Sequence, residues 1–161
     1  MKREMKIIQY DVELDEENRP YLVKENEFRN KRVSCNSPEL IVELLNSDRY
    51  RLNKKSEERV YILGTNNKFT HANIFLLSKG NKDSSICSPF CIYQRLLLSN
   101  STQFAMIHNH PSGVLTPSRE DIQTSKKLKE LAKQMRINFV DSLIIGKDND
   151  YLSLRENGYL D

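Results

Sequence analysis

The sequence predicts one mixed α/β domain, and two observations lead to this prediction. The chain has 161 residues, of which 38% are hydrophobic, so it has the length of a single domain and enough apolar residues for a core. Along the chain, β-prone segments alternate with segments of helical periodicity. The sequence contains no internal repeat and no low-complexity linker that would divide this pattern.

The N-terminal part begins with a strand and ends with a helix. The segment MKIIQYDVEL at 5–14 is strand-like, an acidic turn follows at Asp15–Asn18, and a polar connector is expected from there to about Val33. Ser37 and Pro38 are typical of a helix start, with Ser37 as the N-cap. The apolar residues that follow recur at helical spacing: Leu40, Ile41, Leu44 and Leu45.

The middle of the chain predicts a hairpin and a second helix. Two β-prone runs within 59–78 flank Asn66-Asn67, a pair that tolerates the left-handed conformations of tight turns. His71 falls in this hairpin without a partner in sequence, so we expect it on the surface. A helix is expected to begin at Pro89. Because this helix is apolar nearly all round, we expect it to be buried.

The C-terminal half predicts a strand, a long helix and two more strands. The segment QFAMIH at 103–108 is a short apolar strand, and 117–136 has the periodicity of a long amphipathic helix. Two strands follow at 138–146 and 151–158, around the polar turn Lys147–Asp150. In the long helix, four residues are expected to face the core: Ile122, Leu128, Leu131 and Met135.

Composition argues against several classes of protein. The net charge is only +3 and the basic residues are interspersed with acids, which gives no indication of nucleic-acid binding. No window approaches the roughly 18 apolar residues of a membrane span, and we recognise no secretory signal at the N-terminus. Cys35, Cys87 and Cys91 are an odd number without CxxC spacing. This favours reduced thiols in a cytoplasm over disulfides or a cysteine-based zinc site.

The segment HNHPSGVLTPSRED at 108–121 is the candidate site. Alternate residues of a strand share a face, so His108 and His110 would project together, with Asn109 turned away. Ser118 would open the next helix and place Asp121 in its first turn. Two imidazoles and one carboxylate form the ligand set of a catalytic zinc with a fourth position open. Ser118 and Asp121 also fit a capping box, which needs no metal.

The whole segment resembles the JAMM (MPN+) metalloprotease motif, and in particular the RadC-like branch of the JAB domain family. The resemblance runs from about Glu57 to Leu160, roughly two-thirds of the chain. Further matching landmarks are Gly80, Ser84–Ile86, Pro89 and the closing LIIG and YLSLRENGYL. The resemblance implies a JAB/MPN (cytidine-deaminase-like) mixed sheet flanked by helices with one zinc site. It also implies His108, His110 and Asp121 as the ligands of that zinc.

The resemblance further implies an upstream glutamate as general base. Glu57 and Glu58 are the candidates, and strand parity lets only one of them face the metal. The spacing to Gly80 in the family pattern favours Glu58. The resemblance implies hydrolysis of an amide or isopeptide bond in an unidentified peptide or protein, with the Ser118 hydroxyl helping to hold the oxyanion. The rival hypothesis is a non-catalytic RadC-like binding or scaffold module, associated with DNA repair or mobile-element maintenance. A nucleic-acid partner would rest on family association alone.

Two positions depart from the family pattern. Ser142 follows Asp141 where the family usually has histidine, and Phe90 follows Pro89 where the family usually has a basic residue. Neither residue is a metal ligand. The helix-hairpin-helix segment that precedes the domain in full-length RadC proteins is not visible. We therefore expect residues 1–54 to be an N-terminal extension with one helix packed on the domain, and residues 55–161 to be the RadC-like JAB/MPN domain.

Overall fold

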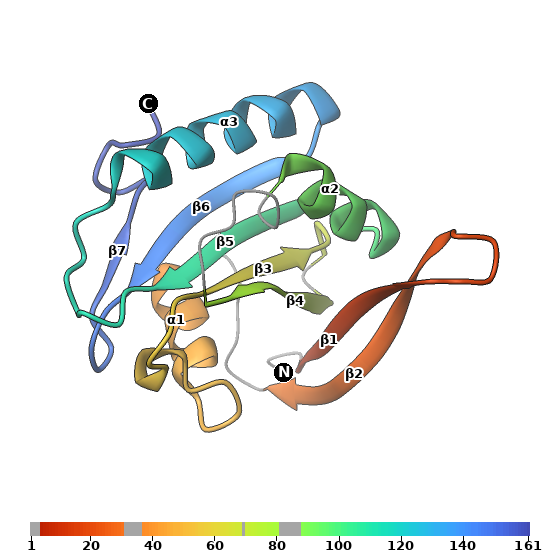
Figure 1. Ribbon diagram of the computed structural model, residues 1–161, viewed down its shortest axis with the longest axis horizontal. Coiled ribbons are helices and arrows are strands. Elements are labelled where there is room, and N and C mark those ends of the chain that lie inside the picture. The colour runs from red at the N-terminus through yellow and green to blue at the C-terminus, as the bar shows by residue number, and fades with distance from the viewer. Residues whose placement is uncertain (1–3, 31–36, 69, 81–87) are drawn as a thin grey trace.

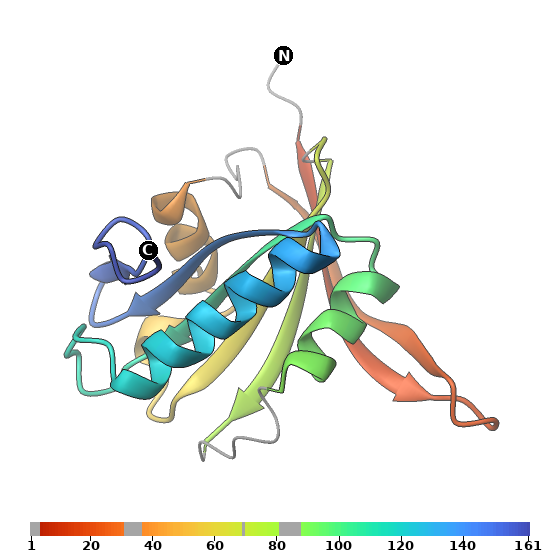
Figure 2. The ribbon, with the colours of Figure 1, turned by 90° about the horizontal axis from the view of Figure 1, so that it is seen from above.

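The chain forms one seven-stranded mixed sheet with helices on both faces (Figures 1 and 2). A computed structural model describes residues 4–30, 37–68, 70–80 and 88–161. Cys35, Cys87 and the Ser84–Ile86 landmark lie outside the described residues. The elements are β1 (Met5–Leu14), β2 (Pro20–Asn30), α1 (Pro38–Asn46), the 3-10 helix η1 (Leu52–Lys54), β3 (Arg59–Thr65), β4 (His71–Lys79), α2 (Pro89–Leu98), β5 (Gln103–Asn109), α3 (Arg119–Met135), β6 (Asn138–Ile145) and β7 (Tyr151–Ser153).

The sheet places the end of β5 beside the start of α3. The strand order is β2-β1-β4-β3-β5-β6-β7, in which β1–β4 and β5–β6 are parallel and the other pairs antiparallel. Parallel neighbours need a crossover connection, and α3 provides it between β5 and β6. The chain therefore leaves β5 and enters α3 at the same edge of the sheet (Figure 1).

Two hydrophobic cores lie on opposite faces of the sheet. The buried residues of α1 contribute to one core, and those of α2 and α3 contribute to the other (Figure 2). The central strand β5 contributes side chains to both cores, because Ala105 and Ile107 face the α1 core while Phe104 and Met106 face the α3 core. His108 continues the second series, so its side chain lies on the α3 face.

The segment expected as a polar connector is strand β2, so that expectation was wrong. It pairs with β1 across the turn Asp15–Asn18, and this hairpin projects beyond the rest of the sheet (Figure 1). β2 is an edge strand, so its charged side chains remain in water while the hydrogen-bond ladder with β1 holds the backbone. An edge strand of this kind needs no regular alternation of apolar residues, so the sequence gives little indication that β2 is a strand.

Four further expectations differ from the structure, wholly or in part. Helix α2 buries one side only, because Phe90 and Leu97 remain 74% and 61% exposed while Ile92, Tyr93 and Leu96 are buried. Met135 at the end of α3 is also exposed. The last strand ends at Ser153 and the chain continues in turns. Ser37 precedes α1 as predicted, but its hydroxyl bonds to the Glu39 carboxylate and not to a backbone amide.

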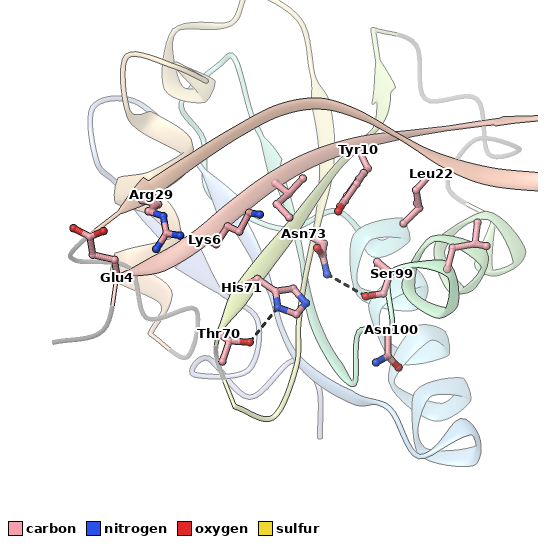
Figure 3. A pocket seen from close by; sticks show the side chains of 12 residues that line it. Glu4, Lys6, Tyr10, Leu22, Arg29, Thr70, His71, Asn73, Ser99 and Asn100 are labelled. Carbon is pink, nitrogen blue, oxygen red and sulfur yellow. Dashed lines mark hydrogen bonds between the residues drawn. The ribbon is translucent and has the colours of Figure 1, made fainter. Parts of the chain in front are cut away.

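The predicted hairpin around Asn66-Asn67 is confirmed as β3 and β4. His71 is half-buried at the start of β4, with its Nδ1 atom 3.1 Å from the Thr70 hydroxyl. It lines a cavity of about 560 Å³ together with Lys6 and Arg29, at the end of the sheet opposite the start of α3 (Figure 3).

Within the described residues, no helix is both long and apolar enough to cross a membrane.

Candidate metal centre

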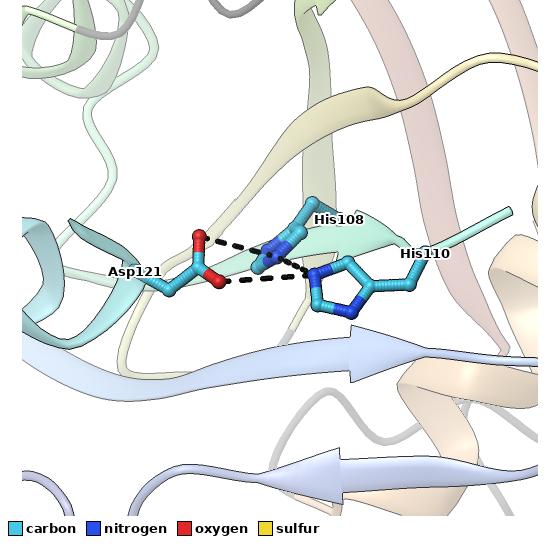
Figure 4. Close-up of side chains that lie close together, drawn as sticks. All are labelled: His108, His110 and Asp121. Atoms are coloured by element: carbon cyan, nitrogen blue, oxygen red, sulfur yellow. Dashed lines mark hydrogen bonds and ion pairs between the residues drawn. The ribbon is translucent and has the colours of Figure 1, made fainter. Parts of the chain in front are cut away.

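His108 and His110 lie together at the end of β5, as strand alternation predicts. The two Nε2 atoms are 3.1 Å apart, and His108 is only 3% exposed. The side chain of Asn109 turns to the other face of the strand, where it bonds to the backbone of Glu57 and Arg59. Figure 4 shows the two imidazoles converging on the carboxylate of Asp121.

Asp121 reaches this position because Ser118 begins helix α3. The Ser118 hydroxyl accepts a hydrogen bond from the Asp121 amide at 3.0 Å, and Asp121 Oδ2 accepts one from the Ser118 amide at 2.8 Å. The predicted capping box is therefore present. The same carboxylate lies 3.6 Å from His108 Nε2 through Oδ1, and 3.7 Å from His110 Nε2 through Oδ2. The capping role and the approach to the histidines coexist.

The loop after β5 fixes which nitrogen of His110 faces this group. His110 Nδ1 lies 2.6 Å from the carbonyl oxygen of Val114. A carbonyl oxygen can only accept, so Nδ1 carries the hydrogen and the lone pair of the neutral ring is on Nε2. Gly113 makes the loop possible, because its φ of +81° is a conformation that favours glycine.

The electrostatics of the group favour a bound cation. Burial opposes ionisation of Asp121, but the imidazoles of His108 and His110 beside its oxygens outweigh burial and hold the pKa of Asp121 well below its usual range. The nearby carboxylate of Asp121 raises the pKa of His110, and the charge of the Glu58 carboxylate contributes in the same direction. Positive charge is therefore stabilised at this point, whether a proton or a metal ion carries it.

The donor set and its spacing fit zinc. One nitrogen from each histidine and one carboxylate oxygen lie within 4.8 Å of one another. Ligand atoms about 2.0–2.2 Å from a tetrahedral centre lie roughly 3.3–3.6 Å apart. The two Nε2 atoms are 3.1 Å apart and lie 3.6 and 3.7 Å from the Oδ1 and Oδ2 atoms of Asp121, so the three side chains are close enough to share one metal ion. His108, His110 and Asp121 are thus the residues that would hold the metal.

Glu57 and Glu58 immediately precede β3 and occupy different surroundings. The Glu57 carboxylate accepts a hydrogen bond from the Arg59 guanidinium at 3.1 Å and lies 3.7 Å from Lys79 Nζ. Val60 pairs with His108 across β3 and β5. Glu58 is two residues before Val60, so an extended backbone directs it to the face of His108. Together with its effect on His110, this favours Glu58 as the general base, which stays a prediction.

Asn109 fixes the backbone on both sides of Glu58. Its Oδ1 accepts a hydrogen bond from the Arg59 amide at 2.7 Å, and its Nδ2 donates one to the Glu57 carbonyl at 3.1 Å. These are the two peptide groups that flank Glu58. Asn109 is 2% exposed, so water does not compete for these bonds. Sequence reasoning placed Asn109 away from the metal but missed this contact, which depends on the register between β3 and β5.

A family model described as RadC-like JAB domain matches residues 35–159. The chain belongs to the RadC-like JAB domain family. The mixed sheet with helices on both faces fits a JAB-like fold. The matched region includes α1 as well as the chain from Glu57 to residue 159, and the division of the chain after residue 54 stays a prediction.

Relatives of this RadC-like chain occur in bacteria and archaea. It is 33% identical over 132 residues to "UPF0758 protein SH1266" of Staphylococcus haemolyticus, covering 82% of this chain and 56% of the relative. It is 37% identical over 130 residues to a UPF0758 protein of Methanosarcina acetivorans, covering 81% and 55%. The chain therefore spans about half the length of the curated relatives it matches.

The two departures from the RadC-like pattern have different surroundings. Asp141 is 1% exposed and accepts hydrogen bonds from the amides of Ser142 and Arg155 and from the Ser153 hydroxyl, so it joins β6 to β7 and the turn that follows. The Ser142 hydroxyl is buried without a hydrogen-bond partner in the described part of the chain. Phe90 is exposed at the start of α2.

Proposed function

We propose that this RadC-like domain is a zinc-dependent hydrolase of the JAMM type that cleaves a peptide or isopeptide bond. One observation carries the proposal: His108, His110 and Asp121 lie close enough to share one metal ion, and Glu58 immediately precedes the neighbouring strand β3. Two imidazoles and one carboxylate leave a fourth tetrahedral position open, which distinguishes catalytic from structural zinc sites.

Each side chain then has a defined task. Zinc held by the three ligands would lower the pKa of a water molecule from about 15.7 toward roughly 7, making hydroxide available at neutral pH. The carboxylate of Glu58 accepts the proton of the attacking water and returns it to the leaving amine. Val114 keeps His110 in the tautomer that presents Nε2.

Ser118 supplies the remaining donor. Its oxygen already accepts the Asp121 amide, so its hydroxyl hydrogen is available to donate elsewhere. That hydrogen would stabilise the negative charge that develops on the carbonyl oxygen of the substrate. One side chain would therefore both begin helix α3 and contribute to catalysis.

The test is elemental analysis of the purified protein combined with a peptide-library cleavage screen. We expect one zinc per chain and cleavage that is lost in His110→Ala and Glu58→Gln. Zinc in the parent without any cleavage would favour the rival hypothesis, a binding or scaffold module. A salt-dependent DNA titration would then examine the nucleic-acid role, which rests on family association. Absence of stoichiometric zinc from the parent would contradict the assigned ligands.

A further inference from the structure

A cavity of about 480 Å³ lies next to the metal centre along the chain. Its lining includes Lys54, Lys55, Ser56, Pro111, Lys147 and Asp148, and we call it the lysine cleft. Pro111 is bonded to the metal ligand His110, and Ser56 precedes Glu58 by two residues. The lining thus includes the chain beside a metal ligand and the chain that leads to the general base.

The lysine cleft has a firm framework. A Cβ atom added at Gly113 would lie only 2.9–3.0 Å from the side-chain carbons of Lys147, so the Lys147 stem packs against the loop of the metal ligands. The next residue, Asp148, accepts hydrogen bonds on its backbone carbonyl from the side chains of Asn46 and Asn53, at 3.1 and 2.5 Å. The turn between β6 and β7 is therefore held from two sides.

The charges of the lysine cleft are unbalanced. Lys54 Nζ lies 3.9 Å from the Asp148 carboxylate, at the limit of an ion pair. Lys55 and Lys147 have no ion-pair partner within residues 4–30, 37–68, 70–80 and 88–161. Three lysines and one aspartate line the cleft, so its net charge is positive and attracts an anion.

We propose that the lysine cleft holds a carboxylate of the substrate, either an acidic side chain near the scissile bond or a C-terminal carboxylate. This inference rests on the proposed function, because it names the kind of peptide that the same site would accept. A carboxylate fits the cleft better than a nucleic acid does. The described residues that line it include no aromatic side chain to stack on a base and no arginine to grip a phosphate with two bonds. Asp148 would also repel a continuous phosphate backbone.

The test is a binding measurement that needs no turnover. Zinc-loaded protein carrying Glu58→Gln is titrated into short fluorescein-labelled peptides, and anisotropy is followed. One peptide contains glutamates and an amidated C-terminus, a second is neutral with a free C-terminal carboxylate, and a third is neutral and amidated. We expect one of the first two to bind about tenfold more tightly than the third. Which of them does so identifies the source of the carboxylate.

Matched variants locate the binding in the cleft. Lys55→Glu and Lys147→Glu should each weaken the preferred peptide about tenfold, because attraction is replaced by repulsion. Lys147→Arg should retain the affinity, because it keeps the charge. Lys68→Glu makes the same change of charge in the β3–β4 turn, at the opposite end of the sheet, and should leave the affinity unchanged. Zinc content, measured in every variant, shows whether the site is intact.

Three outcomes would overturn the proposal: equal affinity for all three peptides, equal weakening by Lys68→Glu and Lys147→Glu, or tighter binding of a single-stranded oligonucleotide through the same lysines. The last outcome would reassign the cleft to nucleic acid. Failure of the hydrolase proposal is distinguishable. Lysine-dependent peptide binding without cleavage by the Glu58 parent would leave the cleft in place and reject the enzyme. Cleavage that is unchanged by substitution of Lys55 and Lys147 would support the hydrolase and reject the cleft as the binding site.

Discussion

At the scale of single residues, the proposed chemistry depends on which of two adjacent glutamates faces the metal ligands. Glu58→Gln preserves the size of the side chain and one acceptor oxygen, but it cannot take up a proton at neutral pH. We predict a folded variant that retains zinc and turns over about 10²–10⁴-fold more slowly, the range for loss of a general base. Zinc analysis and single-turnover kinetics measure the two quantities separately.

Glu57→Gln is the matched control for that variant. The Glu57 carboxylate contacts Arg59 and Lys79, so its loss should leave turnover at the parental rate. If Glu57→Gln were the slow variant and Glu58→Gln normal, the register assigned to the segment before β3 would be wrong by one residue. The mechanism itself would survive that exchange.

Asn109 gives a second prediction at this scale. Asn109→Ala removes both hydrogen bonds that hold the backbone around Glu58, and a displaced general base should lower turnover about 10- to 100-fold. Zinc content should stay at the parental level, because Asn109 is not a ligand. Hydrogen exchange of the Arg59 amide should become faster. In the Glu58→Gln background, Asn109→Ala should have little further effect on turnover.

Asn73→Ala is the control for Asn109→Ala. Asn73 is equally buried and its amide donates a hydrogen bond to the Ser101 hydroxyl at 3.1 Å, but it lies on β4 at the far end of the sheet. Its replacement should destabilise the fold without slowing turnover. Parental turnover in a zinc-loaded Asn109→Ala protein would mean that Glu58 needs no such support.

The proximity of the three candidate ligands could be predicted from sequence, but the contacts that support them could not. His108 and His110 share a strand face by parity, and Ser118 and Asp121 share one helical turn, so both pairs depend on local geometry alone. Asn109 bonds to a segment about fifty residues earlier in the chain. Such a contact depends on how two strands are aligned, and residue spacing carries no information about that alignment.

At the scale of elements, Ser118 joins helix stability to the proposed chemistry. Ser118→Ala removes the acceptor for the Asp121 amide and should cost about 0.5–2 kcal/mol in the free energy of unfolding. Ser118→Asp should restore the cap, because aspartate is a good N-cap residue, but it has no hydroxyl to donate. We therefore expect Ser118→Asp to have the free energy of unfolding of the parent but a lower turnover rate. Denaturant titration and kinetics on both variants measure these effects, and parental activity in Ser118→Asp would limit Ser118 to a structural role.

Elements with one buried face were predictable, and elements at the margin were not. The stripe of α1 and the two strands around Asn66-Asn67 have strong patterns because each packs one side against a core. Strand β2 is held by hydrogen bonds to β1 and stays largely solvated, so its sequence is polar. For helix α2 the sequence predicts too much burial. Its apolar residues include a face that nothing in the described chain covers.

At the scale of the whole molecule, a metal bound by His108, His110 and Asp121 would connect β5 to α3. Binding to the folded state alone stabilises a protein by about 4 kcal/mol when the free ligand is at roughly 1,000 times its Kd. We predict that a chelator lowers the thermal midpoint of the parent and that added zinc restores it. In His110→Ala the midpoint should not respond to chelator or zinc. A fully responsive variant would show that the metal binds elsewhere.

The order and direction of the strands in the sheet could not be predicted from the sequence. The alternation of strands and helices predicts a mixed sheet, but β1 pairs in parallel with β4, and β3 lies between β4 and β5. The β1–β4 and β3–β5 pairings join segments far apart in the chain. They depend on which faces become covered when all three helices are packed.

The hydrogen bonds of Asn46 and Asn53 to Asp148 span 102 and 95 residues, whereas all three candidate ligands lie within 108–121. During synthesis on the ribosome the two regions therefore become available at different times. By the time α3 has emerged, the chain already contains every ligand and Glu58. The turn at Lys147 and Asp148 can dock on α1 and η1 only after the chain has been extended past β6. Closing so long a loop is a slow step in folding. In a nascent chain, the three candidate metal ligands would thus be available before the turn that lines the lysine cleft.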